Sequence, residues 1–275
     1  MNGGTAEDGN LKIGSLKSGS LKIGILGVGN LAAYLVQGAQ TGGHRFVLSP
    51  RGAQTAATLA ARYGCEVAIS NQALVDTCEM ILVCLPAAEG LAILRGLTFR
   101  AGQAVCSAMA AGAPLDVLQA AVAPAGATLS MMPGYANAYS SGPTLLFPAS
   151  PVWAGFFAAC GPVHELPDAH SFETAAVFGA MSGASVFLMR HLASWFEEKG
   201  LSPAIARRLV AETLRGNAEV LLQSDEPLDA ICKGVTTAGG ITEQVLSDLT
   251  RDGALDSWHH AMTRVLHRMA PARKT

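Results

Sequence analysis

Residues 21–32 read LKIGILGVGNLA, and this stretch is the most informative about the fold. Its first residues form an apolar run that suits a buried strand. The residues after it match G-x-G-x-x-A, a form of the dinucleotide-binding fingerprint. The first glycine permits a tight turn, the second lets the backbone approach a pyrophosphate, and the closing alanine lets helix and strand pack closely. The helix that follows offers N–H groups to the phosphates. The expected cofactor contacts here are Gly27, Gly29, Asn30 and Leu31.

Short apolar runs continue to alternate with alanine-rich helical segments as far as residue 132. This alternation is typical of βαβ units, and runs such as MILVCL suit parallel strands that are buried on both faces. The sequence therefore predicts an α/β fold with a doubly wound Rossmann sheet. Its strands are expected at 21–27, 45–49, 66–69, 80–85, 104–109 and 128–132.

Charge density changes along the chain. Of the 275 residues, the first 162 carry 15 charged side chains and the remaining 113 carry 25. From Asp168 onward the pattern is helical, with one long helix over 168–199 or two helices joined near 179–183, and another helix opening at Ser202-Pro203. We expect a flexible tail at 1–20, a Rossmann domain at 21–162 and an all-helical dimerisation and substrate domain at 163–275.

Composition excludes several functional classes. A net charge of −2 gives no electrostatic footprint for nucleic acid. The six cysteines form no CxxC pair, so we expect no metal site and a reducing cytoplasm. The uncharged run Thr174–Met189 is shorter than the roughly 20 residues that a membrane-spanning helix needs. It is interpreted as a helix buried against a second subunit of a homo-oligomer, with no membrane partner.

The end of the second strand predicts the choice of cofactor. NAD-binding proteins usually place an acid there to bond the ribose 2′-hydroxyl. This chain has VLSPRG at 47–52, with no acid in the segment. Ser49 is able to donate to a phosphate oxygen, and Arg51 is able to bind phosphate through two N–H groups. The sequence therefore favours NADP, with a solvated Arg51 as the alternative.

From about Leu21 to Met269 the chain resembles the pyrroline-5-carboxylate reductase family. The resemblance rests on the fingerprint, on SAMAAG at 107–112, on MMP at 131–133 and on VTTAGGIT at 235–242, which resembles that family's VTSPGGTT. It implies a Rossmann domain followed by a helical dimerisation domain. It also implies further cofactor contacts at Asn71, Leu85, Pro86 and Ala110, and a substrate contact at Ser182.

The segment 237–242 is the predicted substrate site. Its glycines permit close approach, and the helix that follows favours a carboxylate at its N-terminus. The resemblance places Thr242 and Thr237 at the family's substrate-binding hydroxyls, and adds Gly239, Gly240 and Ile241 as contacts. The alternative role for the two threonines is helix capping.

The expected reaction is the NADPH-dependent reduction of the cyclic imine 1-pyrroline-5-carboxylate to L-proline. Departures from the family at 134–136 and 182–185 leave open a reductase of another cyclic imine or ketimine acid. A third alternative is a cofactor-binding dimer that has lost catalysis. A β-hydroxyacid dehydrogenase is disfavoured because 172–189 lacks the lysine that such chemistry needs.

Overall fold

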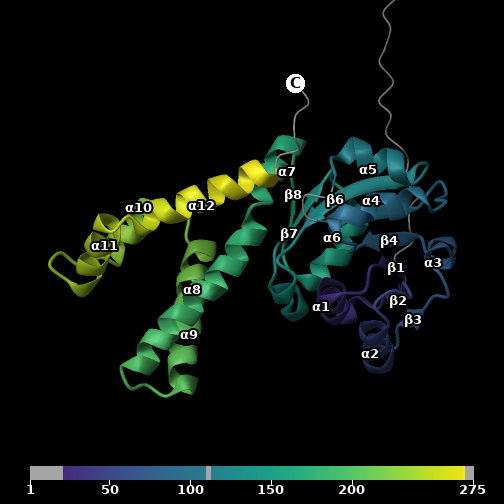
Figure 1. Ribbon diagram of the computed structural model, residues 1–275. Coiled ribbons are helices and arrows are strands. Elements are labelled where there is room, and N and C mark those ends of the chain that lie inside the picture. The colour runs from purple at the N-terminus through teal and green to yellow at the C-terminus, as the bar shows by residue number, and fades with distance from the viewer. Residues whose placement is uncertain (1–20, 110–112, 270–275) are drawn as a thin grey trace, which may run out of the picture. The chain divides into compact units, whose positions relative to one another are not determined.

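The computed structural model describes residues 21–109 and 113–269, in two compact units. The first unit contains one sheet of eight strands in the order β3-β2-β1-β4-β5-β6-β7-β8 (Figure 1). The strands are β1 Lys22–Leu26, β2 Arg45–Leu48, β3 Glu66–Val67, β4 Met80–Val83, β5 Ala104–Ser107, β6 Gly126–Met131, β7 Thr144–Phe147 and β8 Val163–Glu165.

Strands β1 to β6 are parallel, which confirms the predicted doubly wound sheet. The strand order reverses at β1, which pairs with β2 on one side and β4 on the other. In open α/β sheets ligands bind at such a switch point, beyond the carboxyl ends of the strands. The fingerprint turn leaves β1 there.

Helices cover both faces of the sheet. One face packs against α1 (Asn30–Gly38), α2 (Ala53–Tyr63) and α6 (Pro151–Phe157). The other packs against α3 (Asn71–Thr77), α4 (Ala87–Arg95) and α5 (Leu115–Val122). Successive residues of β4 alternate between the two cores, because side chains of a strand point to opposite faces. This explains the uninterrupted apolar run of that strand.

The sequence analysis missed the last two strands and α6. β7 runs antiparallel to β6, and β8 runs parallel to β7. Both strands are short, and the chain reverses direction between β6 and β7, so the parallel succession of the first six strands is interrupted there, although β7, α6 and β8 form a βαβ unit of their own. They carry the first unit on to Gly179, beyond the expected boundary at residue 162.

The second unit, Ala180–Arg268, is helical. The helices of this region are α8 (Phe178–Glu198), α9 (Pro203–Gln223), α10 (Leu228–Gly234), α11 (Ile241–Arg251) and α12 (Ala254–Met269). The expected long helix is two helices, α7 (Ala169–Ala175) and α8, and the break at residues 176–177 lies before the glycines at 179–183. Asp168 caps α7 by accepting from the Ser171 N–H at 2.8 Å.

The stretch Ala169–Glu198 has the length and composition of a membrane span, with 17% of its most apolar window buried. This helical stretch is longer than the uncharged run Thr174–Met189, on which the expectation of no membrane span rested. None of the residues of α8, α10, α11 or α12 in the described chain is buried, and α9 buries only Ala206 and Val210. These helices lack a core of their own, so their apolar faces require another surface to cover them.

Candidate functional site: a dinucleotide turn and its surroundings

The fingerprint turn has the backbone that its glycines predict. Gly27 has φ +92°, and a Cβ there would lie 2.7 Å from the carbonyl oxygen of Cys84, at the end of β4. Gly29 differs: no heavy atom outside its neighbouring residues lies within 4 Å of the position of its Cβ. The first glycine thus serves the fold, whereas the second leaves open space at the N-terminus of α1. A pyrophosphate fits that space.

Ser49 forms a hydrogen bond with the backbone of the fingerprint turn. Its side chain is buried, with 1% exposed, and its Oγ accepts a hydrogen bond from the Gly27 N–H at 3.0 Å. Sequence analysis placed Ser49 at the phosphate. In the structure its hydroxyl ties the end of β2 to the first glycine of the turn.

Arg51 lies on the exposed turn between β2 and α2. Its guanidinium donates to the Glu89 carboxylate at 2.8 Å, and both side chains are more than half exposed. Glu89 belongs to the first turn of α4, 38 residues along the chain from Arg51. The segment around β2 contains no acid, and Glu89 reaches Arg51 from a helix that is distant in sequence.

Three of the other predicted cofactor residues, Leu85, Pro86 and Asn71, lie in the part of the chain that the structure describes. Leu85 is buried, and its backbone N lies 2.9 Å from the position of a Gly27 Cβ. Pro86 precedes α4 as its N-cap. Asn71 is the first residue of α3, whose N-cap Ser70 accepts from the Ala73 N–H at 3.0 Å. Ala110 lies outside the described residues.

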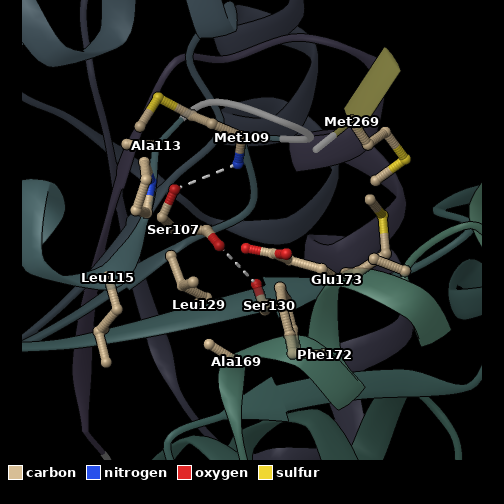
Figure 2. Close-up of a pocket in the computed structure, with 13 residues that line it drawn as sticks. Ser107, Met109, Ala113, Leu115, Leu129, Ser130, Ala169, Phe172, Glu173 and Met269 are labelled. Carbon is tan, nitrogen blue, oxygen red and sulfur yellow. Dashed lines mark hydrogen bonds between the residues drawn. The ribbon is translucent and has the colours of Figure 1, made fainter. Parts of the chain in front are cut away.

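A cavity of about 270 Å³ lies at the carboxyl ends of β5 and β6 (Figure 2). Its polar groups are the buried hydroxyls of Ser107 and Ser130 and the carboxylate of Glu173, which Figure 2 shows directed toward the two serines. Ser130 Oγ donates to the Ser107 carbonyl at 3.0 Å, and Ser107 Oγ accepts from the Met109 N–H at 3.3 Å. The remaining walls are mostly apolar: Met109, Ala113, Pro114, Leu115, Leu129, Met131, Ala169, Phe172, Ala176 and Met269.

This cavity contains residues from the 107–112 and 131–133 segments that carried the family resemblance. Glu173, on α7, is the residue that sequence reasoning missed. Nothing in its local pattern distinguishes it from a solvated helix charge, and only the packing of α7 brings it to the strand ends.

The loop after β6 is held by one buried amide. Asn137 Oδ1 accepts from the Gly134 N–H at 3.0 Å, and its Nδ2 donates to the Gly142 carbonyl at 2.7 Å and the Cys160 carbonyl at 3.3 Å. Beside it, the ring of Tyr135 meets that of Tyr34 edge-on, with centroids 4.8 Å apart. Asn137 therefore fixes the segment in which the chain departs from the family.

The predicted substrate segment lies in the helical unit. Gly239 has φ +70°, and Gly240 rather than a threonine is the N-cap of α11. The carboxylate of Glu243 accepts from the Gly239 N–H at 2.7 Å. An open hollow borders Gly239, Gly240 and Ile241, and Thr242 is half-buried at the second position of α11. Ser182 is half-buried on α8 in the same unit.

Comparisons with known families match the two parts of the chain separately. Residues 171–271 match the family described as pyrroline-5-carboxylate reductase dimerisation. Residues 22–111 match the family described as NADP oxidoreductase, coenzyme F420-dependent. A curated relative, pyrroline-5-carboxylate reductase 3 of Xenopus laevis, is 26% identical over 199 residues, covering 69% of this chain and 72% of the relative.

Solved structures share the fold over about nine-tenths of the chain. The 1-pyrroline-5-carboxylate reductase of Streptococcus pyogenes aligns with a TM-score of 0.80 at 21% identity, over 91% of this chain and 98% of that one. The Plasmodium falciparum pyrroline carboxylate reductase, solved with NADP bound, also gives 0.80, at 17% identity over 90% and 97%. These likenesses show the fold. The two family matches and the curated relative, in turn, support an NADP-dependent oxidoreductase that is a divergent relative of the pyrroline-5-carboxylate reductases.

Proposed function

We propose that the protein reduces 1-pyrroline-5-carboxylate to L-proline with NADPH. The observation that carries this proposal is the match of residues 171–271 to the dimerisation region of the pyrroline-5-carboxylate reductases. The open space at Gly29 supports it, because an NADPH pyrophosphate needs close approach to the backbone at that point.

Reduction of a protonated imine requires little of the protein. NADPH supplies the hydride, and the chain must hold the imine carbon and fix the substrate carboxylate. We assign the carboxylate to Gly239–Thr242. The first N–H of α11 that bonds within the helix is that of Gln244, which donates to the Gly240 carbonyl. The N–H groups of residues 241–243 have no carbonyl partner in the helix, so they are available to a ligand. Thr242 adds a hydroxyl there, and Thr237 is the second proposed hydroxyl.

Glu243 affects the strength of this anion site. Its carboxylate bonds the Gly239 N–H, so it lies on the loop that we assign to an anion. A substrate carboxylate would then depend on the α11 N–H groups and on Thr242 more than on Gly239. We therefore take Thr242 as the principal polar side chain of the site, with Gly239, Gly240 and Ile241 as its walls. Ser182 remains a proposed substrate contact.

A second candidate is a reductase of a different cyclic imine. The observation that favours it is the cavity of Figure 2, whose lining includes Ser107, Met109 and Met131 from the two segments that resemble the family. Its only charged lining group among the described residues is the acid Glu173. A carboxylate among methionines suits a ring that carries positive charge and apolar substituents.

We propose that the working form is a homodimer or larger homo-oligomer. The exposed apolar side chains of the helical unit support this, among them Phe187 and Trp195 of α8, which are 57% and 53% exposed. A second copy covering α8 would bury them, as an obligate interface does. We attribute the exposed apolar side chains of α8 to contact between subunits rather than to insertion into a membrane. The six free thiols support a cytoplasmic location.

The direct test is NADPH oxidation by the full chain against five- and six-membered cyclic imines, with and without a ring carboxylate. Highest kcat/KM for 1-pyrroline-5-carboxylate supports the first proposal, and a six-membered or uncharged ring as best substrate supports the second. NADPH binding without turnover of any imine would contradict both and favour a catalytically inactive cofactor-binding dimer.

Thr242→Ala tests the carboxylate site. Loss of one hydrogen bond to a charged group is worth about 1.5–3 kcal/mol, or roughly a 10- to 150-fold lower kcat/KM. NADPH affinity should not change, because the fingerprint belongs to the other unit. Thr263→Ala is a matched control, since Thr263 bonds only the His259 carbonyl of its own helix, at 2.9 Å. Unchanged turnover in Thr242→Ala would refute the assignment.

A further inference from the structure

Two turns flank the fingerprint on either side of β1. Beyond β2, a methyl group at Gly52 would overlap the Val28 carbonyl oxygen, so the β2–α2 turn rests on the fingerprint. Beyond β4, the Cys84 carbonyl lies against Gly27. Because β1 lies between β2 and β4 in the sheet, the two flanking turns face each other across the end of β1.

The Arg51–Glu89 ion pair joins these two turns. Arg51 belongs to the first turn and Glu89 to the helix that follows the second, and their charged atoms are 2.8 Å apart. The pair therefore crosses the switch point at which the open space at Gly29 lies. We call it the Arg51–Glu89 clasp.

We propose that Glu89 is a specificity-determining residue of the cofactor site. Its carboxylate competes with the 2′-phosphate of NADPH for Arg51, and it accepts from the ribose 2′-hydroxyl of NADH. The inference rests on the proposed use of NADPH and on the role expected of Arg51 from the sequence, which is to bind the 2′-phosphate. It makes the choice of cofactor a balance between one cation and one acid that are distant in sequence.

The charges give the direction of each effect. A phosphate that binds Arg51 lies near a carboxylate, and the repulsion between them weakens NADPH binding. The same carboxylate forms a charge-assisted hydrogen bond with a 2′-hydroxyl, as the acid of NAD-binding proteins does. Glu89 thus narrows the difference in affinity between the two cofactors. Because both side chains are exposed, salt should weaken the NADPH effect.

The test is the Kd of NADPH and of NADH for the full chain, with 2′,5′-ADP and 5′-AMP as competing probes. Glu89→Gln keeps the size of the side chain and removes its charge. It should tighten NADPH and 2′,5′-ADP binding roughly 3- to 10-fold at low salt. It should weaken NADH binding about threefold or more. Glu212→Gln, which breaks the exposed Arg208–Glu212 pair of α9, is the matched control and should change neither.

The outcomes separate this inference from the proposed function. If Glu89→Gln leaves both Kd values unchanged, or weakens NADPH binding, while Arg51→Ala selectively weakens NADPH binding, the inference about Glu89 is wrong and Arg51 keeps its role. If Arg51→Ala weakens NADPH and NADH binding equally, Arg51 does not bind the 2′-phosphate, and the inference about Glu89 is wrong as well. Turnover of the imine by the wild-type protein stands or falls independently of both results.

Discussion

The two fingerprint glycines should respond in opposite ways to the same change. At Gly27 an added methyl group meets the Cys84 carbonyl at 2.7 Å, and φ is +92°. A left-handed conformation costs an L-residue about 1–2 kcal/mol, and overpacking against backbone costs about 1–3 kcal/mol. Gly27→Ala should therefore lower the free energy of unfolding by about 2–5 kcal/mol.

Gly29→Ala should leave the fold almost unchanged. Gly29 is the N-cap of α1, with φ −114° and ψ −161°, which is extended backbone that alanine adopts without strain. Its Cβ would enter space that is clear to 4 Å. We expect a change in unfolding free energy within about 1 kcal/mol, because the poorer N-cap and the stiffer unfolded chain act in opposite directions. The methyl group would occupy the space that we assign to the pyrophosphate, so the Kd for NADPH should rise at least about tenfold.

Both quantities are measured on the full chain at one fixed protein concentration, because assembly contributes to apparent stability. Urea unfolding followed by tryptophan fluorescence gives the free energy, and titration with NADPH gives the Kd. If Gly29→Ala binds NADPH as the wild type does, the pyrophosphate does not lie at Gly29. A Gly27→Ala protein as stable as the wild type would contradict the close contact with β4.

Three further predictions concern stability and thiol chemistry. Asn137→Ala should lower the free energy of unfolding by about 3–5 kcal/mol in the same urea assay, because it leaves the Gly142 carbonyl and other buried backbone groups without partners. Asn137→Asp keeps the acceptor for the Gly134 N–H, so its free energy of unfolding should fall by less. Desolvation lowers the pKa of His44 in the folded protein, so the unfolded chain binds a proton there first as pH falls through about 6.5. The free energy of unfolding should therefore decrease in that window. The same decrease in a His44→Gln protein would show that His44 is not its cause. Of the six cysteines only Cys232 is exposed, and burial raises the pKa of the Cys84 and Cys160 thiols to about 12, so a thiol reagent at pH 8 should modify one group quickly and the rest only on unfolding.

The Rossmann half could be predicted from the sequence because local pattern and tertiary structure agree there. The run 80–85 is apolar because β4 is buried on both faces, and Gly27 is a glycine because the turn needs positive φ. β7 and β8 escaped prediction because both are short and because the reversal of direction between β6 and β7 depends on tertiary pairing, which local pattern does not specify.

The site was less predictable than the fold. Glu89 reaches Arg51 from another helix, and Glu173 reaches the strand ends only when α7 packs, so neither is visible as a motif. Ser49 was predicted from its position after β2 to donate to a phosphate, but the hydrogen bond that its Oγ accepts from the Gly27 N–H could not be predicted. Contacts of this kind depend on side-chain direction and on elements that are distant along the chain, and sequence spacing specifies neither.

We propose that hydride passes from NADPH to the carbon of a cyclic imine held by this chain. The most direct measurement uses NADPH deuterated at the transferable C4 position, 1-pyrroline-5-carboxylate and the purified full chain, with the product analysed by mass spectrometry. We expect proline that carries one deuterium at the former imine carbon, formed in equal amount to NADP⁺. NADP⁺ formation without labelled proline, or no consumption of NADPH by a chain that binds it, would contradict the claim.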